Sequence, residues 1–144
     1  MIQRIQTVYL LLSVLSTALM FFLPVWTHSA SIDEVTIGSV GAGTHIVLLL
    51  IWVIMLLVQF ITIFFFKHRK RQMSFCQLGI LLNVLFILTA FVFIYEERSN
   101  IDDFSISNFK IGSFLPLAST IFLFLANKNI RKDEELVKSM DRLR

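Results

Sequence analysis

Four apolar stretches constrain this chain more than any other feature of its sequence. They cover residues 5–26, 44–66, 75–95 and 111–128, and none has Asp, Glu, Lys or Arg in its interior. About 20 apolar residues are enough for a helix to cross the hydrocarbon core of a bilayer, which is roughly 30 Å thick. An ionised Asp, Lys or Arg side chain near the centre of a transmembrane helix would raise the free energy of membrane insertion by about 2.5–3.5 kcal/mol. The pattern predicts an all-α membrane protein, a bundle of four transmembrane helices.

The composition agrees with a lipid environment. Hydrophobic residues make up 56% of the 144 residues, the mean hydropathy is +0.78, and there are 15 Phe. A compact soluble fold of this length has too little interior for so much apolar surface. The length fits one domain, residues 1–144, with a polar tail over residues 128–144.

The basic residues predict the orientation of the chain. Eleven of the 13 Lys and Arg residues lie on one side, in the two terminal segments and between the second and third stretches. The other side has only Arg98 and Lys110, together with six acids. Because cytoplasmic segments carry the excess of Lys and Arg, both termini are expected in the cytoplasm. A cleaved signal peptide is the competing interpretation of the N-terminus, but its apolar run is too long and lacks an A-x-A site.

The segment "KHRKRQ" between the second and third stretches contains a cluster of basic residues: Lys67, Arg69, Lys70 and Arg71. Such a cluster also occurs in nucleic-acid-binding proteins. Next to a transmembrane segment, it is better explained by orientation and by attraction to anionic lipid headgroups. We therefore expect no nucleic acid partner.

Two segments on the opposite side alternate briefly between apolar and polar residues. Val35 and Ile37 show the alternation in the first segment, and Phe104, Ile106 and Phe109 show it in the second. Period-two alternation is typical of strands. The two segments are expected to form either a small acidic β cap over the outer end of the bundle or ordered loops without a sheet.

A few polar residues interrupt the apolar stretches, and three of them are candidates for contacts between helices. Gln59 lies in the second stretch, and Gly79 and Asn83 lie four residues apart on one face of the third. In membranes such residues join helices or allow their close approach. The alternative is a polar pathway for a substrate, although such routes usually contain ionisable groups.

The sequence offers no catalytic, cofactor-binding or metal-binding constellation. His28, His45 and His68 are not at metal-ligand spacing, and no nucleophile or phosphate-loop motif is present. We therefore expect a protein without enzymatic activity and without a cofactor. An enzyme acting on lipids would require His28 or His45 to approach the acid pairs of the outer segments.

The polar C-terminal segment has the pattern of an amphipathic helix that continues from the fourth stretch. Arg131 can pair with Glu135, four residues later. One face of this helix is apolar and must lie on the membrane surface, on the "KHRKRQ" segment or on another protein. Another protein is favoured, because the segment is less cationic than typical helices on membrane surfaces. The face consists of Ile130, Leu136, Val137, Met140 and Leu143.

The opening "MIQRIQTVYLLL", the "FFLP" that closes the first stretch and the ending "LANKNIRKDEELVKSMDRLR" together resemble a family of small four-span membrane proteins of the Bacteroidota. This family is catalogued as domain of unknown function 4293. The resemblance covers the whole chain. It implies a protein of the bacterial inner membrane and brings with it no established activity and no catalytic residue.

These features lead to two hypotheses about function. The first is a non-enzymatic accessory subunit of a larger inner-membrane complex, for example an export or envelope-biogenesis machine, with integral membrane proteins as partners. The alternative is a small oligomeric transporter or channel, because four apolar spans alone leave little room for an aqueous route.

Overall fold

The computed structural model describes residues 2–29, 36–98 and 108–141. Most of these residues are helical. In chain order the elements are α1 (Ile2–Leu19), β1 (Trp26–Ser29), β2 (Thr36–Val40), α2 (Ile46–Phe64), the 3₁₀ turn η1 (Phe65–Lys67), α3 (Arg69–Arg98), the 3₁₀ turn η3 (Ile111–Phe114) and α4 (Leu115–Asp141).

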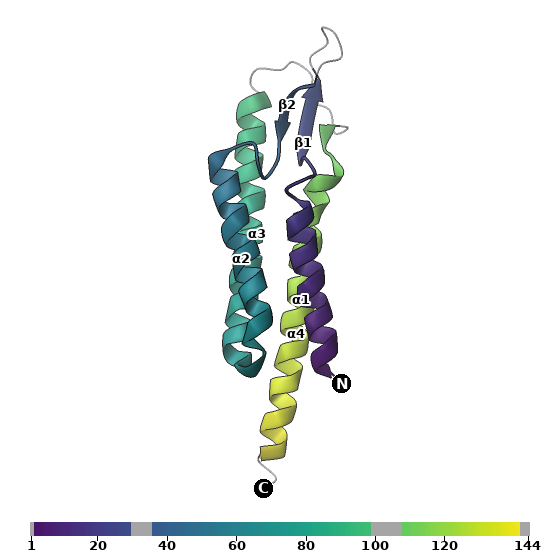
Figure 1. Ribbon diagram of the computed structural model, residues 1–144, viewed down its shortest axis with the longest axis vertical. Helices are drawn as coiled ribbons and strands as arrows, with labels where there is room; N and C mark the ends of the chain where they lie inside the picture. The colour runs from purple at the N-terminus through teal and green to yellow at the C-terminus, as the bar shows by residue number, and fades with distance from the viewer. Residues whose placement is uncertain (1, 30–35, 99–107, 142–144) are drawn as a thin grey trace.

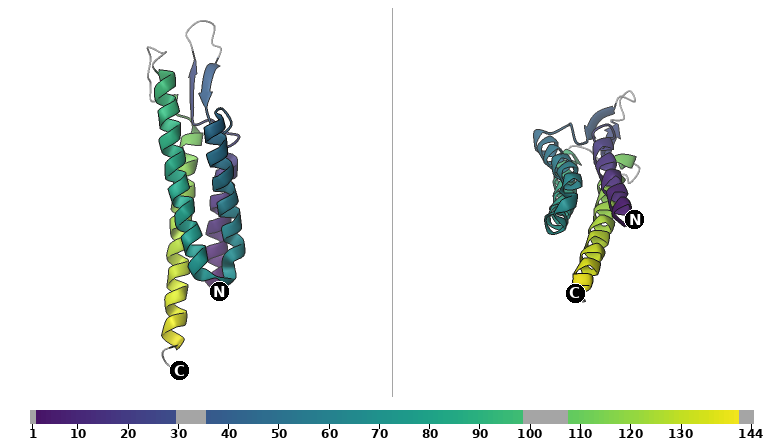
Figure 2. Two further views of the ribbon diagram at one scale, coloured as in Figure 1. Left: turned by 90° about the vertical axis from the view of Figure 1, so that its left-hand side faces the viewer. Right: turned by 60° about the horizontal axis from the view of Figure 1, so that its bottom comes forward.

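The four helices pack side by side in a ring (Figures 1 and 2). Helix α1 packs against α4 and α2, and α3 packs against α4 and α2. The two termini lie at one end of the molecule and the β-hairpin lies at the other (Figure 1). The C-terminal part of α4 extends beyond the ends of the other helices at the end with the termini.

Among the described residues, three helices are long and apolar enough to cross a membrane: Ile46–Phe64, Arg69–Glu96 and Ile111–Val137. The apolar part of α1 is shorter and covers Ile5–Leu19. Large apolar side chains along all four helices are exposed on the outside of the bundle. An outer surface of this kind is what lipid-facing helices have.

Buried positions recur every three or four residues along each long helix. In α4 they are Pro116, Ser119, Leu123, Ala126, Ile130 and Asp133. This spacing places one stripe of each helix toward its neighbours, as in four-helix bundles. The stripe continues beyond the apolar stretch, so the start of the polar C-terminal segment belongs to the core.

Helix α1 ends earlier than the first apolar stretch, which was predicted to run through residue 26. The amides of Phe21 and Phe22 donate to the carbonyls of Ala18 and Leu19, at 3.2 and 3.1 Å, in a tightened last turn. Pro24 has no amide hydrogen and disfavours a helical residue before it, so the chain leaves the helix here. Trp26 then begins β1 instead of ending a helix.

The described strands form one antiparallel pair, in which Trp26 lies opposite Val40. Both strands come from the first outer segment, between α1 and α2. The second outer segment contributes an isolated bridge between Phe109 and Trp26, while Phe104 and Ile106 lie outside the described residues. Within the described residues, the first segment thus forms a hairpin to which Phe109 is joined, and a strand around Phe104 and Ile106 stays a prediction.

Gly112 in η3 allows the chain before α4 to pass directly against Leu23 and Pro24, which follow α1. A Cβ atom at this position would collide with the carbonyl oxygens of Leu23 and Pro24. Next to it, the Lys110 amide donates to the Val25 carbonyl at 3.1 Å. The entry into α4 is thus fixed to the start of the hairpin.

The basic segment is part of the helical structure rather than a loop. Helix α3 already begins at Arg69, directly after η1 and His68. The His68 carbonyl accepts the Gln72 amide at 3.0 Å, which closes the first turn. Helix α3 is accordingly longer at both ends than the stretch predicted over residues 75–95.

Candidate functional site

A layer of buried polar side chains crosses the centre of the bundle. Each of the four helices contributes to it, and its members are Ser13, Thr17, Gln59, Asn83 and Ser119, all fully buried. Apolar clusters lie on both sides of the layer. One includes Met20, Met55 and Phe86, and the other includes Leu10, Cys76 and Leu123. The layer therefore separates an apolar core next to the hairpin from one next to the termini.

Gln59 connects three helices through its side-chain amide. Its Oε1 atom accepts a hydrogen bond from the Thr17 hydroxyl of α1 at 2.8 Å, and its Nε2 atom donates to the Ser119 hydroxyl of α4 at 3.2 Å. The oxygens of Thr17 and Ser119 are themselves 3.2 Å apart. In this arrangement each amide atom has a partner, as a buried polar group requires.

Asn83 adds α3 to the layer. Its Nδ2 atom donates to the Gly79 carbonyl at 2.9 Å and lies 3.5 Å from the Ser119 hydroxyl oxygen. Its Oδ1 atom is buried and has no hydrogen-bond partner among the described residues. Such an orphan acceptor lowers stability unless a water molecule binds it.

Gly79 lies at a close contact of α3 with α4 and α2. A Cβ atom there would lie 3.0 Å from Cδ1 of Leu123 in α4 and 3.7 Å from Cγ of Gln59 in α2. The structure thus brings together Gln59, Gly79 and Asn83, the three residues singled out from the sequence. Thr17 and Ser119, which complete the layer, are short hydroxyl residues in apolar helices, and only the tertiary structure shows that they meet.

The chemistry of this layer is that of hydroxyl and carboxamide groups. Its members carry no charge, and they bond mainly to one another and to the backbone; Ser13, for example, donates to the Leu10 carbonyl at 2.8 Å. A proton or ion route across a membrane usually contains ionisable groups or a water-filled cavity. This arrangement is instead suited to joining four helices in one register.

A second cluster of polar side chains lies at the end of the bundle where the termini are. Nε2 of Gln6 in α1 donates to Oδ2 of Asp133 in α4 at 2.9 Å, and also to the Asn129 carbonyl at 3.2 Å. Nη1 of Arg69 in α3 donates to the carbonyl oxygen of Asp133 at 3.1 Å. Sequence reasoning missed Asp133, although its position three residues after Ile130 places it on the same helical face.

The four basic residues predicted to contact lipid headgroups differ in their surroundings. Arg69 is half-buried and holds the end of α4, so it is engaged within the chain. Lys70 and Arg71 are exposed. The side chain of Lys67 lies outside the described residues.

The predicted docking face of the C-terminal segment requires one correction. Ile130 is fully buried against residues such as Leu10 of α1 and Cys76 of α3, so its partner is this chain itself. Leu136 and Val137 are 52% and 39% exposed. The side chain of Met140 and the whole of Leu143 lie outside the described residues.

The C-terminal segment is helical as predicted, since α4 is continuous from Leu115 to Asp141. The expected pair of Arg131 and Glu135 is present, with Nε and Oε1 3.2 Å apart. Both side chains are exposed, so this ion pair contributes little to stability.

Two of the three histidines, His45 and His68, have side chains within the described part of the structure. His45 stacks on Phe93 with the ring centroids 4.1 Å apart, and His68 is exposed. The side chain of His28 is outside the described part. Within that part, no group of three or more His, Cys, Asp or Glu residues is arranged to hold a metal ion.

The chain matches a known protein family. Residues 2–143 match the model of the family described as Domain of unknown function (DUF4293). No curated protein and no solved structure matches the chain.

Proposed function

We propose, starting from the fact that the chain belongs to the DUF4293 family, that it is a non-enzymatic accessory subunit of a larger complex in the bacterial inner membrane. In this proposal the four helices all span the bilayer, both termini lie in the cytoplasm, and the end of α4 docks on an integral membrane protein. An export or envelope-biogenesis machine is the class of host that we would test first.

The membrane arrangement is supported by length and by charge. The apolar part of α1, Ile5–Leu19, is followed by the apolar residues 20–23, so the apolar run approaches the roughly 20 residues that a span needs. The two termini and the basic start of α3 belong to the same end of the bundle (Figure 1). That end carries the excess of Lys and Arg, which favours a cytoplasmic location.

The exposure of Leu136 and Val137 carries the docking part of the proposal. They are adjacent apolar residues on the part of α4 that extends beyond the other helices, after the buried stripe has ended at Asp133. Their neighbours Lys132 and Glu135 are exposed and charged. In the described structure, no other element packs on this face of α4. Two apolar side chains next to charged ones are better suited to binding a protein surface than to the interior of a bilayer.

The alternative, a small oligomeric transporter or channel, has less support. A route within one bundle would have to pass through the polar layer, where the hydroxyl and amide groups are mostly occupied by each other, so a route between several copies would be needed. Liposome flux assays and a search for oligomers would reveal such an activity directly.

Photo-crosslinking in living cells tests the docking proposal. A photoreactive amino acid at position 136 should give a discrete adduct with an integral membrane protein, identified by mass spectrometry. The matched control is position 131, which is also exposed but lies on another face of the same helix. The double substitution Leu136→Ser and Val137→Ser should abolish co-purification of that protein. Equal adducts at both positions, together with a lone monomer after gentle extraction, would contradict the proposal.

A further inference from the structure

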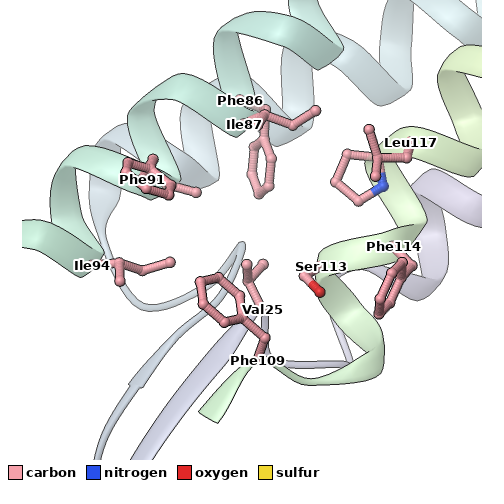
Figure 3. Close-up of a pocket in the computed structure, with 11 residues that line it drawn as sticks. Val25, Phe86, Ile87, Phe91, Ile94, Phe109, Ser113, Phe114 and Leu117 are labelled. Carbon is pink, nitrogen blue, oxygen red and sulfur yellow. The ribbon is translucent and has the colours of Figure 1, made fainter. Parts of the chain in front are cut away.

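An apolar groove of about 200 Å³ lies between α3 and the start of α4, near the hairpin (Figure 3). Phe86, Ile87 and Phe91 line it from α3, and Phe114 and Leu117 line it from η3 and α4. Val25 and Phe109 close one end. The walls therefore come from segments that the bundle brings together from distant parts of the sequence.

The chemistry of the walls selects a hydrocarbon. The polar side chain among the lining residues is Ser113, and its hydroxyl already donates to the Lys110 carbonyl at 2.7 Å. A polar ligand would lose its hydration in the groove without gaining hydrogen bonds, which is costly. An apolar group gains free energy by burial in proportion to the surface removed from water or from looser packing.

The size of the groove selects a thin occupant. An α-helix with its side chains is about 10–12 Å across, which is too wide for a space of about 200 Å³. A single unbranched chain fits the space between two helices. The rim residues Phe91, Phe114 and Leu117 are each half exposed or more, so the groove opens to the surroundings of the bundle.

A basic residue lies next to the groove in the chain. Lys110 is exposed and stands between the lining residues Phe109 and Ser113; its carbonyl accepts hydrogen bonds from both the amide and the hydroxyl of Ser113, at 3.0 and 2.7 Å. The sequence places only Arg98 as a second basic residue at this end. A cation at the edge of an apolar groove complements an anion attached to a hydrocarbon chain.

We propose that this groove is a phospholipid site, in which one acyl chain lies between α3 and α4 and the lipid phosphate is paired with the Lys110 ammonium group. The occupant is a phospholipid of the leaflet on the hairpin side. This site rests on the membrane location proposed above, but not on the docking of the C-terminal segment.

The test uses the full chain in vesicles of phosphatidylethanolamine and phosphatidylglycerol. A small share of the phosphatidylglycerol carries a diazirine near the end of one acyl chain. After illumination, mass spectrometry should locate adducts mainly on Phe91, Phe114 and Leu117. Equally exposed apolar residues elsewhere, such as Leu50 of α2, should carry few. Even labelling of all exposed apolar residues would overturn the site.

Two substitutions that fill the groove sharpen the test. Ala90 lines the groove and is almost fully buried, so Ala90→Leu places new atoms inside it and should lower adducts in the groove about tenfold. If Ala90→Leu prevents folding, Leu117→Trp decides, because Leu117 lies at the rim and is 50% exposed. Its control is Leu81→Trp on α3, where the side chain is 61% exposed and outside the groove. If Ala90→Leu or Leu117→Trp folds and the amount of adduct on the groove residues equals that of the wild type, the proposal is overturned.

The charge is tested separately. Lys110→Gln should lower adducts in the groove about fivefold, because one basic residue near a lipid surface is worth about a factor of that size. Lys128→Gln removes a charge at the other end of the bundle and should leave adducts in the groove unchanged. Equal effects of the two substitutions would overturn the role of Lys110. If the wild-type chain fails to float with the vesicles, the membrane location and the lipid site are both wrong, whereas even labelling removes the site alone.

Discussion

The hydroxyl of Thr17 donates a hydrogen bond of 2.8 Å to Oε1 of Gln59, two side chains that are fully buried and belong to the first and second helices. Together with Ser119 and Asn83, this pair forms a polar layer between two apolar clusters. A layer of buried hydrogen bonds is satisfied in only one register, because each donor needs its acceptor at the same level of the bundle. The polar layer therefore specifies how the four helices align.

Replacing the central amide should weaken the bundle measurably. Gln59→Leu removes the bonds to both Thr17 and Ser119 and should lower the free energy of unfolding by about 1–2 kcal/mol, because one interhelical bond in a membrane contributes about 0.6 kcal/mol on average and about 1.7 at most. Unfolding by denaturing detergent in mixed micelles measures it. Thr89→Val is the control, because the Thr89 hydroxyl bonds only to carbonyls of its own helix. A loss as large for Thr89→Val as for Gln59→Leu would mean that the layer has no special role.

The contact between Gly79 and Leu123 predicts a compensating pair of substitutions. Gly79→Ala places a methyl group 3.0 Å from Cδ1 of Leu123 and should destabilise the bundle by about 1–3 kcal/mol. In the Leu123→Ala background, Gly79→Ala should cost less than in the wild type, because the shortened side chain leaves space for the new methyl group. A double-mutant cycle of unfolding free energies measures the coupling. Simple additivity of the two substitutions would contradict the contact.

The bond between Gln6 and Asp133 should hold the C-terminal part of α4 against α1. Gln6→Leu removes one partner of a buried carboxylate, and hydrogen bonds to charged groups are worth about 1.5–3 kcal/mol. We expect faster amide hydrogen exchange in the second half of α4 and unchanged exchange near the hairpin. Lys132→Ala, an exposed position one residue before Asp133, should leave the exchange unaltered. Equal exchange in wild type and Gln6→Leu would show that the bond does not hold the helix.

The proposed orientation predicts which end of the bundle an impermeant reagent reaches. The single cysteine, Cys76, is fully buried, so it is first replaced by Ala to give a silent background. In that background, Lys110→Cys should react with an impermeant thiol reagent in intact spheroplasts, whereas Lys132→Cys should react only after permeabilisation. Both positions are exposed, so access across the membrane decides the result. The reverse pattern would invert the orientation.

Part of the polar layer could be anticipated from residue type. A Gln and an Asn in otherwise apolar helices need partners, since an unpaired amide in lipid costs several kcal/mol. The identity of the partners could not be anticipated. Ser119 lies 102 residues from Thr17 and 60 from Gln59, and hydroxyl residues are also satisfied by the carbonyl four residues before them, as Thr120 is.

The sequence by itself determined the helical class, the apolar stretches, the helical continuation of the last one and the family. Those properties follow from the transfer free energy of side chains and from the helical period, both of which are local. Only the tertiary structure decided that Ile130 is core rather than surface, that Asp133 meets Gln6, and that the hairpin forms within the first outer segment. These outcomes depend on which faces meet, and an apolar stripe packs equally well on lipid, on another protein or on its own neighbours. Which of these surfaces the stripe packs on is settled by how the helices lie relative to one another. The local pattern of residues does not specify that arrangement.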